Sequence, residues 1–137
     1  MSDAIGLTTA ASRLAGITDE AIRLFQTLDF DLHSVTKQVK QLESFSELVK
    51  EIELQPLVDG NDESEQLELT RQILLHCHKV ISRLLSQLEW VDNGGKHTLT
   101  QQGKMGVYAE LNKQEIKDPF EELHREQLCL NFFQSSK

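Results

Sequence analysis

The sequence predicts an all-α fold, an up-and-down four-helix bundle with an irregular glycine-rich segment before its last helix. Four stretches of the 137-residue chain repeat apolar residues at three-and-four spacing, which gathers them on one helical face. The chain has only two prolines, and its turn-forming Gly, Asn and Asp residues cluster between the stretches. With 39% hydrophobic and 26% charged residues the composition is that of a globular chain, so we expect one domain over residues 1–137.

The first helix is expected over residues 3–26 and the second over residues 29–54. One apolar stripe runs the length of each, and Ser2 or Asp3 can cap the first. Part of the second stripe also keeps the seven-residue period of a parallel coiled-coil dimer, at Leu28, Val35, Leu42 and Val49. The apolar stripes are wider than a coiled-coil seam, so the bundle is preferred over the dimer.

The third helix is expected over residues 64–90 and the last over residues 115–134. A surface loop around Pro56 separates the second and third helices. Asp118 begins a good helix-start pattern, because the next residues place a proline in the first turn and a glutamate beyond it. Residues 91–114 are predicted to be a loop, since they contain an Asn-Gly turn signal and four of the seven glycines.

Net charge limits the kinds of molecule that the protein is expected to bind, and the cysteines indicate its cellular compartment. Fourteen Lys and Arg against 22 Asp and Glu give a formal charge of −8, which disfavours nucleic acid as a partner. A faint winged-helix pattern over residues 99–104 lacks the basic recognition helix of a nucleic-acid reader. Cys77 and Cys129 both fall in apolar helical patterns, which indicates a reducing compartment and predicts a cytoplasmic protein. No signal-peptide pattern and no run of 18 apolar residues is present in the sequence.

No constellation in the sequence predicts catalysis, a cofactor or a metal. Consecutive helical residues point about 100° apart, so His76, Cys77 and His78 cannot close on one ion. Glu121 and His124 have the spacing of a di-iron bundle but lack the second pair that such a site requires. The segment 95–97 resembles the end of a phosphate-binding loop without its preceding glycine or its hydroxyl. The protein is therefore expected not to be an enzyme.

The start of the first helix is the most informative segment. Between Met1 and Thr18 only Asp3 and Arg13 are charged, and small residues line one side. Such a segment is either a tightly packed core helix or one that can associate with copies of itself on a membrane. The candidate residues for membrane or self contact are Ile5, Gly6, Leu7, Ala11, Leu14, Ala15, Gly16 and Ile17.

Packing patterns along nearly the whole chain resemble one family. They are the segments 5–17 and 39–49, the apolar residues between Cys77 and Leu88, and the final stretch 115–133. Together they resemble the helical N-terminal domain of fungal signal-transducing NTPases of the NOD-like receptor (STAND) type, related to the HeLo and HeLo-like cell-death domains. Tyr108, where a Trp is common, and Pro119, in a run of helix formers, depart from the family pattern.

The resemblance implies an effector domain of a fungal innate-immunity or incompatibility receptor. In such relatives, activation drives self-association, and the N-terminal helix is released to attack membranes and cause regulated cell death. The implied partners are further copies of the domain, membrane lipids, and an upstream receptor domain or protein. The implied location is cytoplasmic, with relocation to the plasma membrane on activation.

A second function remains open beside this one. The wide apolar faces and the charge of −8, which disfavours contact with anionic membranes, suit an oligomerisation or adaptor module without membrane activity.

Overall fold

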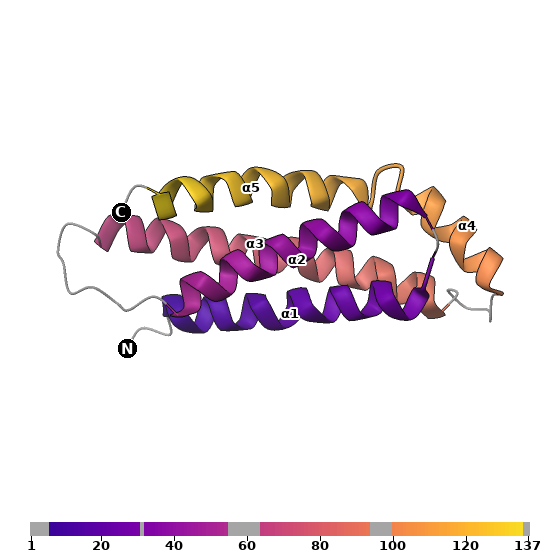
Figure 1. Ribbon diagram of the computed structural model, residues 1–137, viewed down its shortest axis with the longest axis horizontal. Coiled ribbons are helices and arrows are strands. Elements are labelled where there is room, and N and C mark those ends of the chain that lie inside the picture. Colours follow the sequence, from indigo (N-terminus) through magenta and orange to yellow (C-terminus); the bar gives the residue numbers. More distant parts are fainter. Residues whose placement is uncertain (1–5, 31, 55–63, 94–99, 136–137) are drawn as a thin grey trace.

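The chain forms an all-α structure, as the hydrophobic spacing predicts. A computed structural model describes residues 6–30, 32–54, 64–93 and 100–135. These residues contain five helices and no strand (Figure 1). The helices are α1 (Leu7–Leu28), α2 (His33–Leu54), α3 (Ser64–Asn93), α4 (Gln101–Leu111) and α5 (Lys117–Ser135). The predicted caps Ser2 and Asp3 and the predicted loop around Pro56 lie outside the described residues.

The long helices α1, α2, α3 and α5 lie along the long axis of the molecule, and each runs opposite to the long helix before it (Figure 1). α1 packs against α2 and α3, and α5 packs on α3. The short helix α4 lies obliquely at the end where α1 finishes and α5 begins. Side-chain ridges of neighbouring helices bury a continuous apolar core in this arrangement.

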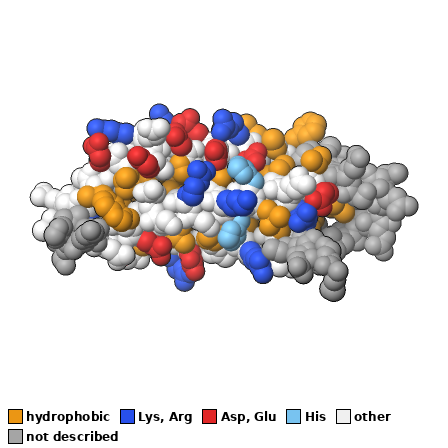
Figure 2. All heavy atoms as spheres, turned by 180° about the vertical axis from the view of Figure 1, so that it is seen from behind, with side chains coloured by type: hydrophobic (Ala, Val, Ile, Leu, Met, Phe, Trp, Pro, Cys, Tyr) orange, Lys and Arg blue, Asp and Glu red, His pale blue; other side chains and the backbone are white. Residues whose placement is uncertain are grey.

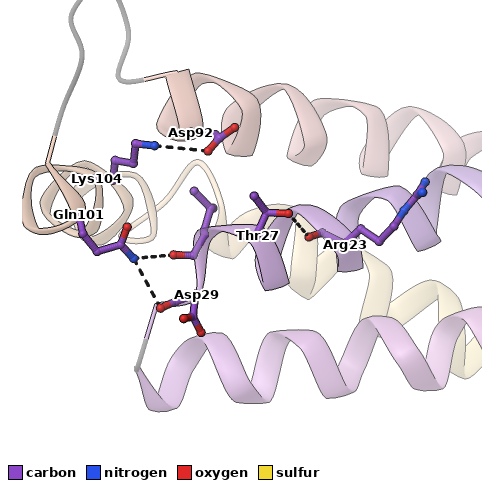
Figure 3. A network of polar contacts seen from close by, with 7 residues as sticks. Arg23, Thr27, Asp29, Asp92, Gln101 and Lys104 are labelled. Atoms are coloured by element: carbon purple, nitrogen blue, oxygen red, sulfur yellow. Dashed lines mark hydrogen bonds and ion pairs between the residues drawn. The ribbon is translucent and has the colours of Figure 1, made fainter.

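α1 ends at a left-handed cap residue. Asp29 adopts a left-handed backbone conformation, with φ of 51°, and its N–H donates to the carbonyl oxygen of Phe25 at 3.1 Å. Aspartate tolerates this conformation better than most residues, which accounts for the helix end at this position. The Gln101 side chain of α4 reaches back and donates to the carbonyl oxygen of Leu28 at 2.5 Å, as Figure 3 shows. α4 therefore satisfies backbone groups at the end of α1.

The predicted loop over residues 91–114 is wrong for most of its length. α3 continues to Asn93, and residues 101–111 form α4. Thr100 caps α4 by accepting the N–H of Gly103 at 3.1 Å, and Tyr108 anchors it with only 1% of its surface exposed. Capping and the burial of one large aromatic ring outweigh the low helix propensity of its two glycines. Residues 94–99, which hold the other glycines of the segment, lie outside the described residues.

Aromatic side chains from four segments meet at the α4 end of the molecule. The rings of Phe25 and Tyr108 are in T-shaped contact with centroids 6.3 Å apart. Phe30 lies 5.5 Å from Tyr108, and Phe120 of α5 lies 6.2 Å from Phe25. Edge-to-face and tilted pairs of this kind are favourable geometries. The cluster fixes the C-terminal end of α1 to both α4 and α5.

The last helix begins slightly differently from the prediction. α5 starts at Lys117, so Asp118 lies inside the first turn instead of capping it. A carboxylate in the first turn is still favourable beside the positive end of the helix dipole, and Pro119 is tolerated there because no N–H is needed.

Candidate functional site

The eight predicted contact residues do not form one surface. Ala11, Leu14 and Ala15 are buried in the core between α1 and its neighbours. Leu7 and Ile17 are partly buried at the edge of the core, and Gly6 and Gly16 are exposed. Ile5 lies outside the described residues. Among the described candidates, the structure thus places the apolar residues on the inner face of α1 or at its edge, and the glycines on the exposed side.

The N-terminal half of α1 is held mainly by small side chains. Its buried residues are Ala10, Ala11, Leu14, Ala15 and Thr18, and Leu14 is the only large one among them. Burying an alanine methyl contributes about 0.8 kcal/mol, whereas a buried leucine or phenylalanine contributes about 1.5–3 kcal/mol. The C-terminal half buries Phe25 and Leu28 instead. Packing therefore holds the first half of α1 less strongly than the second.

Local features of the backbone weaken the same half. Gly6 is the N-cap residue, makes no side-chain capping bond, and is followed by no acidic residue in the first turn. Gly16 is exposed, and a Cβ built on it would meet no atom within 4 Å, so packing does not require glycine there. A helical glycine costs about 0.5–1 kcal/mol relative to alanine. The Thr18 hydroxyl also donates to the carbonyl oxygen of Leu14 at 2.6 Å, a bond that tends to bend helices.

Asp19 marks the end of this weakly held segment. Its carboxylate accepts a hydrogen bond from the Ser46 hydroxyl at 2.9 Å and pairs with the Lys50 ammonium at 3.2 Å, both on α2. Before Asp19, the described part of α1 carries one charged side chain, Arg13, which is exposed together with Thr8, Thr9 and Ser12. Residues 7–18 therefore combine a small-residue inner face with a nearly uncharged outer face.

Of the thiol and imidazole groups that the sequence draws attention to, Cys77 is buried in the core and His76 lies beside a carboxylate of α5. Burial raises the pKa of the Cys77 thiol far above its usual value, and the carboxylates of Glu126 and Glu122 add to this shift. His76 on α3 lies 3.7 Å from the Glu122 carboxylate of α5, which also pairs with Arg83 at 3.2 Å. Among the described residues, no three His, Cys, Asp or Glu side chains gather closely enough to hold a metal ion.

On the face opposite to the view of Figure 1, the described residues carry charges of both signs. In Figure 2, basic and acidic side chains are interspersed across this face, with small hydrophobic areas between them. None of the described helices has the length and apolar character that crossing a bilayer requires.

A groove between α2 and α5 is the feature that sequence analysis missed. Its volume is about 480 Å³, and its walls include Lys37 and Gln41 from α2 and Lys117, Phe120 and Arg125 from α5. Helical periodicity places Lys37 outside the apolar stripe of its own helix, but periodicity says nothing about which helices lie together in space. Predicting the groove would have required knowing that α2 and α5 are neighbours in space.

Searches of protein-family models, curated proteins and solved structures find no match to this chain.

Proposed function

We propose that this domain is a non-enzymatic, HeLo-like effector module of a fungal innate-immunity or incompatibility receptor. It self-associates on activation and acts on membranes through its N-terminal helix to cause regulated cell death. In this proposal α1, α2, α3 and α5 are the up-and-down four-helix bundle, and α4 is an addition at one end. The observation that carries the proposal is the construction of residues 7–18, which are weakly held and nearly uncharged on the outside.

Release of this segment is the first step of the proposed mechanism. Leaving the core exposes Leu14 and the apolar surface of α2 and α3 that it covered, at a cost of about 1.5–3 kcal/mol for each large side chain. A trigger must favour the open state by more than this cost. Clustering of the domain by a receptor supplies that free energy, and the contacts of Asp19 with α2 set the C-terminal limit of release.

Membrane contact is the second step. The released segment presents Leu7, Leu14 and the buried alanines on one face and hydroxyl side chains with Arg13 on the other. A helix of this kind lies in the plane of the membrane interface, and its small residues allow copies to approach closely. The protein accordingly moves from the cytoplasm to the plasma membrane, where its partners are lipids and further copies.

An adaptor module without membrane activity is the second candidate, and one observation favours it. Leu128 and Phe132 lie one turn apart on α5 and are 57% and 68% exposed. Exposed apolar side chains in adjacent positions are typical of protein contact surfaces.

Leakage of dye from anionic vesicles tests the proposal. The domain is clustered through an oligomer fused to its C-terminus, and residues 1–137 are compared with residues 18–137. Ala11→Glu places a charge on the apolar face of α1, and Ser12→Glu places the same charge on the polar face next to it.

We expect the full domain and Ser12→Glu to cause leakage, and the truncated domain and Ala11→Glu to cause none. Ala11→Glu also buries a charge and so weakens the packing of α1, which favours release of the helix. If this variant causes no leakage, the loss therefore lies in membrane contact and not in release. Leakage by residues 18–137 would refute the proposal. Absence of leakage from the clustered full domain would favour the adaptor module.

A further inference from the structure

The groove lies between α2 and α5, the neighbouring pair of long helices that packs least closely. α1 packs on α2 and α3, and α5 packs on α3, but α2 and α5 have few direct contacts. Side-chain amides bridge them: Gln41 donates to the carbonyl oxygen of Phe120 at 2.8 Å, and Gln127 donates to the Ser44 hydroxyl at 3.0 Å. These polar contacts hold the helices at a fixed separation without filling the space between them.

The floor of the groove is fixed and partly apolar. Phe120 contributes buried apolar surface, with 5% of the residue exposed. Gln38 donates to the side-chain oxygen of Asn112 at 2.8 Å and accepts the hydroxyl of Tyr108. Because these amides are held by other parts of the fold, the floor needs no rearrangement to receive a ligand.

The rim of the groove is positively charged on an otherwise acidic chain. Lys37, Lys117 and Arg125 line it, and Glu121 is the one carboxylate among the described lining residues. All four side chains are exposed, and none of the three cations forms an ion pair with a described carboxylate. The groove therefore carries two more positive than negative side chains, whereas the chain as a whole has a charge of −8. This contrast attracts an acidic ligand.

The spacing of the cations indicates the shape of the ligand. Lys117 and Arg125 are eight residues apart on one helix, which separates them by about 12 Å along the axis. Lys37 stands on the opposite wall. A single phosphate or lipid headgroup cannot reach all three, whereas an elongated ligand with several acidic groups can. The aliphatic stems of the lining lysine, arginine and glutamine side chains, together with Phe120, make most of the groove's surface apolar although its residues are mostly polar. A groove of this kind between two helices can receive an amphipathic helix.

We infer that the α2–α5 groove docks an amphipathic helix of a partner protein whose apolar face is flanked by acidic side chains. Its apolar residues cover Phe120, and its carboxylates meet Lys37, Lys117 and Arg125. Glu121 lies four residues from both cations of α5 and disfavours a carboxylate midway between them, which selects the register of the ligand. This inference goes beyond the proposed function and does not depend on release of α1.

Binding of a designed probe tests the inference. The probe is a labelled amphipathic helical peptide with leucines at three-and-four spacing and glutamates on both flanks, and its matched control carries glutamine in place of glutamate. Fluorescence anisotropy measures the affinity of each for the domain. The groove variant is Lys37→Glu with Arg125→Glu. The control variant, Lys40→Glu with Lys79→Glu, makes the same charge change at two exposed lysines outside the groove.

We expect the groove variant to weaken binding of the acidic peptide by about tenfold or more, and the control variant to change it by less than about twofold. The glutamine peptide should bind about tenfold more weakly than the acidic one. Added salt should weaken the binding of the acidic peptide and leave the binding of the glutamine peptide unchanged. Circular dichroism checks the fold of each variant. The neutral pair Lys37→Gln with Arg125→Gln replaces the groove variant if charge reversal disturbs the fold.

Four results would overturn the inference. They are absence of binding to the unaltered domain up to about 1 mM peptide, equal weakening by the groove and control variants, equal affinity for the two peptides, and groove-dependent binding of phosphatidylserine vesicles without binding of the peptide. The last result would assign the groove to a membrane surface.

Discussion

The hydroxyl of Tyr108 on α4 donates a hydrogen bond to the side-chain oxygen of Gln38 on α2. This contact joins residues seventy positions apart in the sequence and holds α4 against the end of the molecule. Because Gln38 also lies in the wall of the α2–α5 groove, the same bond connects the groove to the aromatic cluster. The shape of the groove therefore depends on a residue outside both helices that form it.

Replacing Tyr108 with Phe should lower the free energy of unfolding by about 1–2 kcal/mol, because it removes one hydrogen bond and leaves the Gln38 oxygen without this donor. Tyr108→Ala should cost about 3–5 kcal/mol, since a buried ring is lost. Urea unfolding followed by circular dichroism measures both. Equal losses for the two variants would show that the ring contributes nothing beyond the hydroxyl.

The stability of the domain should also fall at high pH. Burial raises the pKa of Tyr108 above its ordinary value, and the hydrogen bonds with Ser34 and Gln38 oppose this shift without reversing it. A group whose pKa is higher in the folded state contributes stability that is complete below its unfolded pKa, about 10 for tyrosine, and is lost as the pH rises toward the folded pKa. Urea midpoints measured from neutral pH to above pH 10 should show a steeper fall for the unaltered domain than for Tyr108→Phe. Parallel curves for the two proteins would contradict the attribution of the high-pH loss of stability to Tyr108.

Gly16→Ala should raise the free energy of unfolding by about 0.5–1 kcal/mol, because alanine favours the helix and its methyl group enters open space. Hydrogen exchange should show the added protection over the first turns of α1. Gly106→Ala in α4 is the matched control, since a Cβ there also meets no atom within 4 Å. Its added protection should be confined to α4, and a loss of stability in either variant would contradict the open surroundings of these glycines.

A double-mutant cycle should show that Asp19 holds α1 mainly through Ser46. Ser46 is 3% exposed and the Asp19 side chain 44% exposed, so their hydrogen bond is partly shielded from water and should couple by about 1 kcal/mol. The pair with Lys50 is about half exposed and should couple by less than about 1 kcal/mol. Asp19→Ala should also increase hydrogen exchange over residues 7–18. A larger coupling with Lys50 than with Ser46 would reverse this order.

The two cysteines should differ strongly in their reaction with a thiol reagent. Cys129 is exposed and should react at once with a disulfide reagent such as Ellman's reagent. Cys77 is buried and its raised pKa keeps the thiolate scarce, so it should react only as the domain unfolds. The rate of the slow phase should increase with urea. Two fast thiols in the native domain would contradict the burial of Cys77.

Much of the fold could be predicted from local patterns, and the rest depended on contacts between distant residues. The apolar stripes located four long helices because periodicity is a property of each segment alone. Helix α4 was missed, since its glycines predict a loop and only the burial of Tyr108 against α1 shows why a helix forms. The groove was missed for the same reason: Lys37 and Lys117 are eighty residues apart, and no pattern along the chain brings them together.

The candidate residues of α1 show the same division. Low charge and small residues singled out the segment, but the candidate set drawn from it combined residues of both faces. Burial of Ala11 and Leu14 with exposure of Gly16 makes that separation.

The two ends of α1 differ in their resistance to force. The left-handed cap at Asp29 and the hydrogen bond from Gln101 to Leu28 hold only its C-terminal end. A force pulling on the N-terminus would open α1 one turn at a time and would break the contacts of Leu7, the buried alanines and Leu14 in succession. The same force applied at the α1–α2 turn would load the rings of Phe25, Phe30 and Tyr108 together. The helix should therefore open at low force from its first residue and resist strongly from its last.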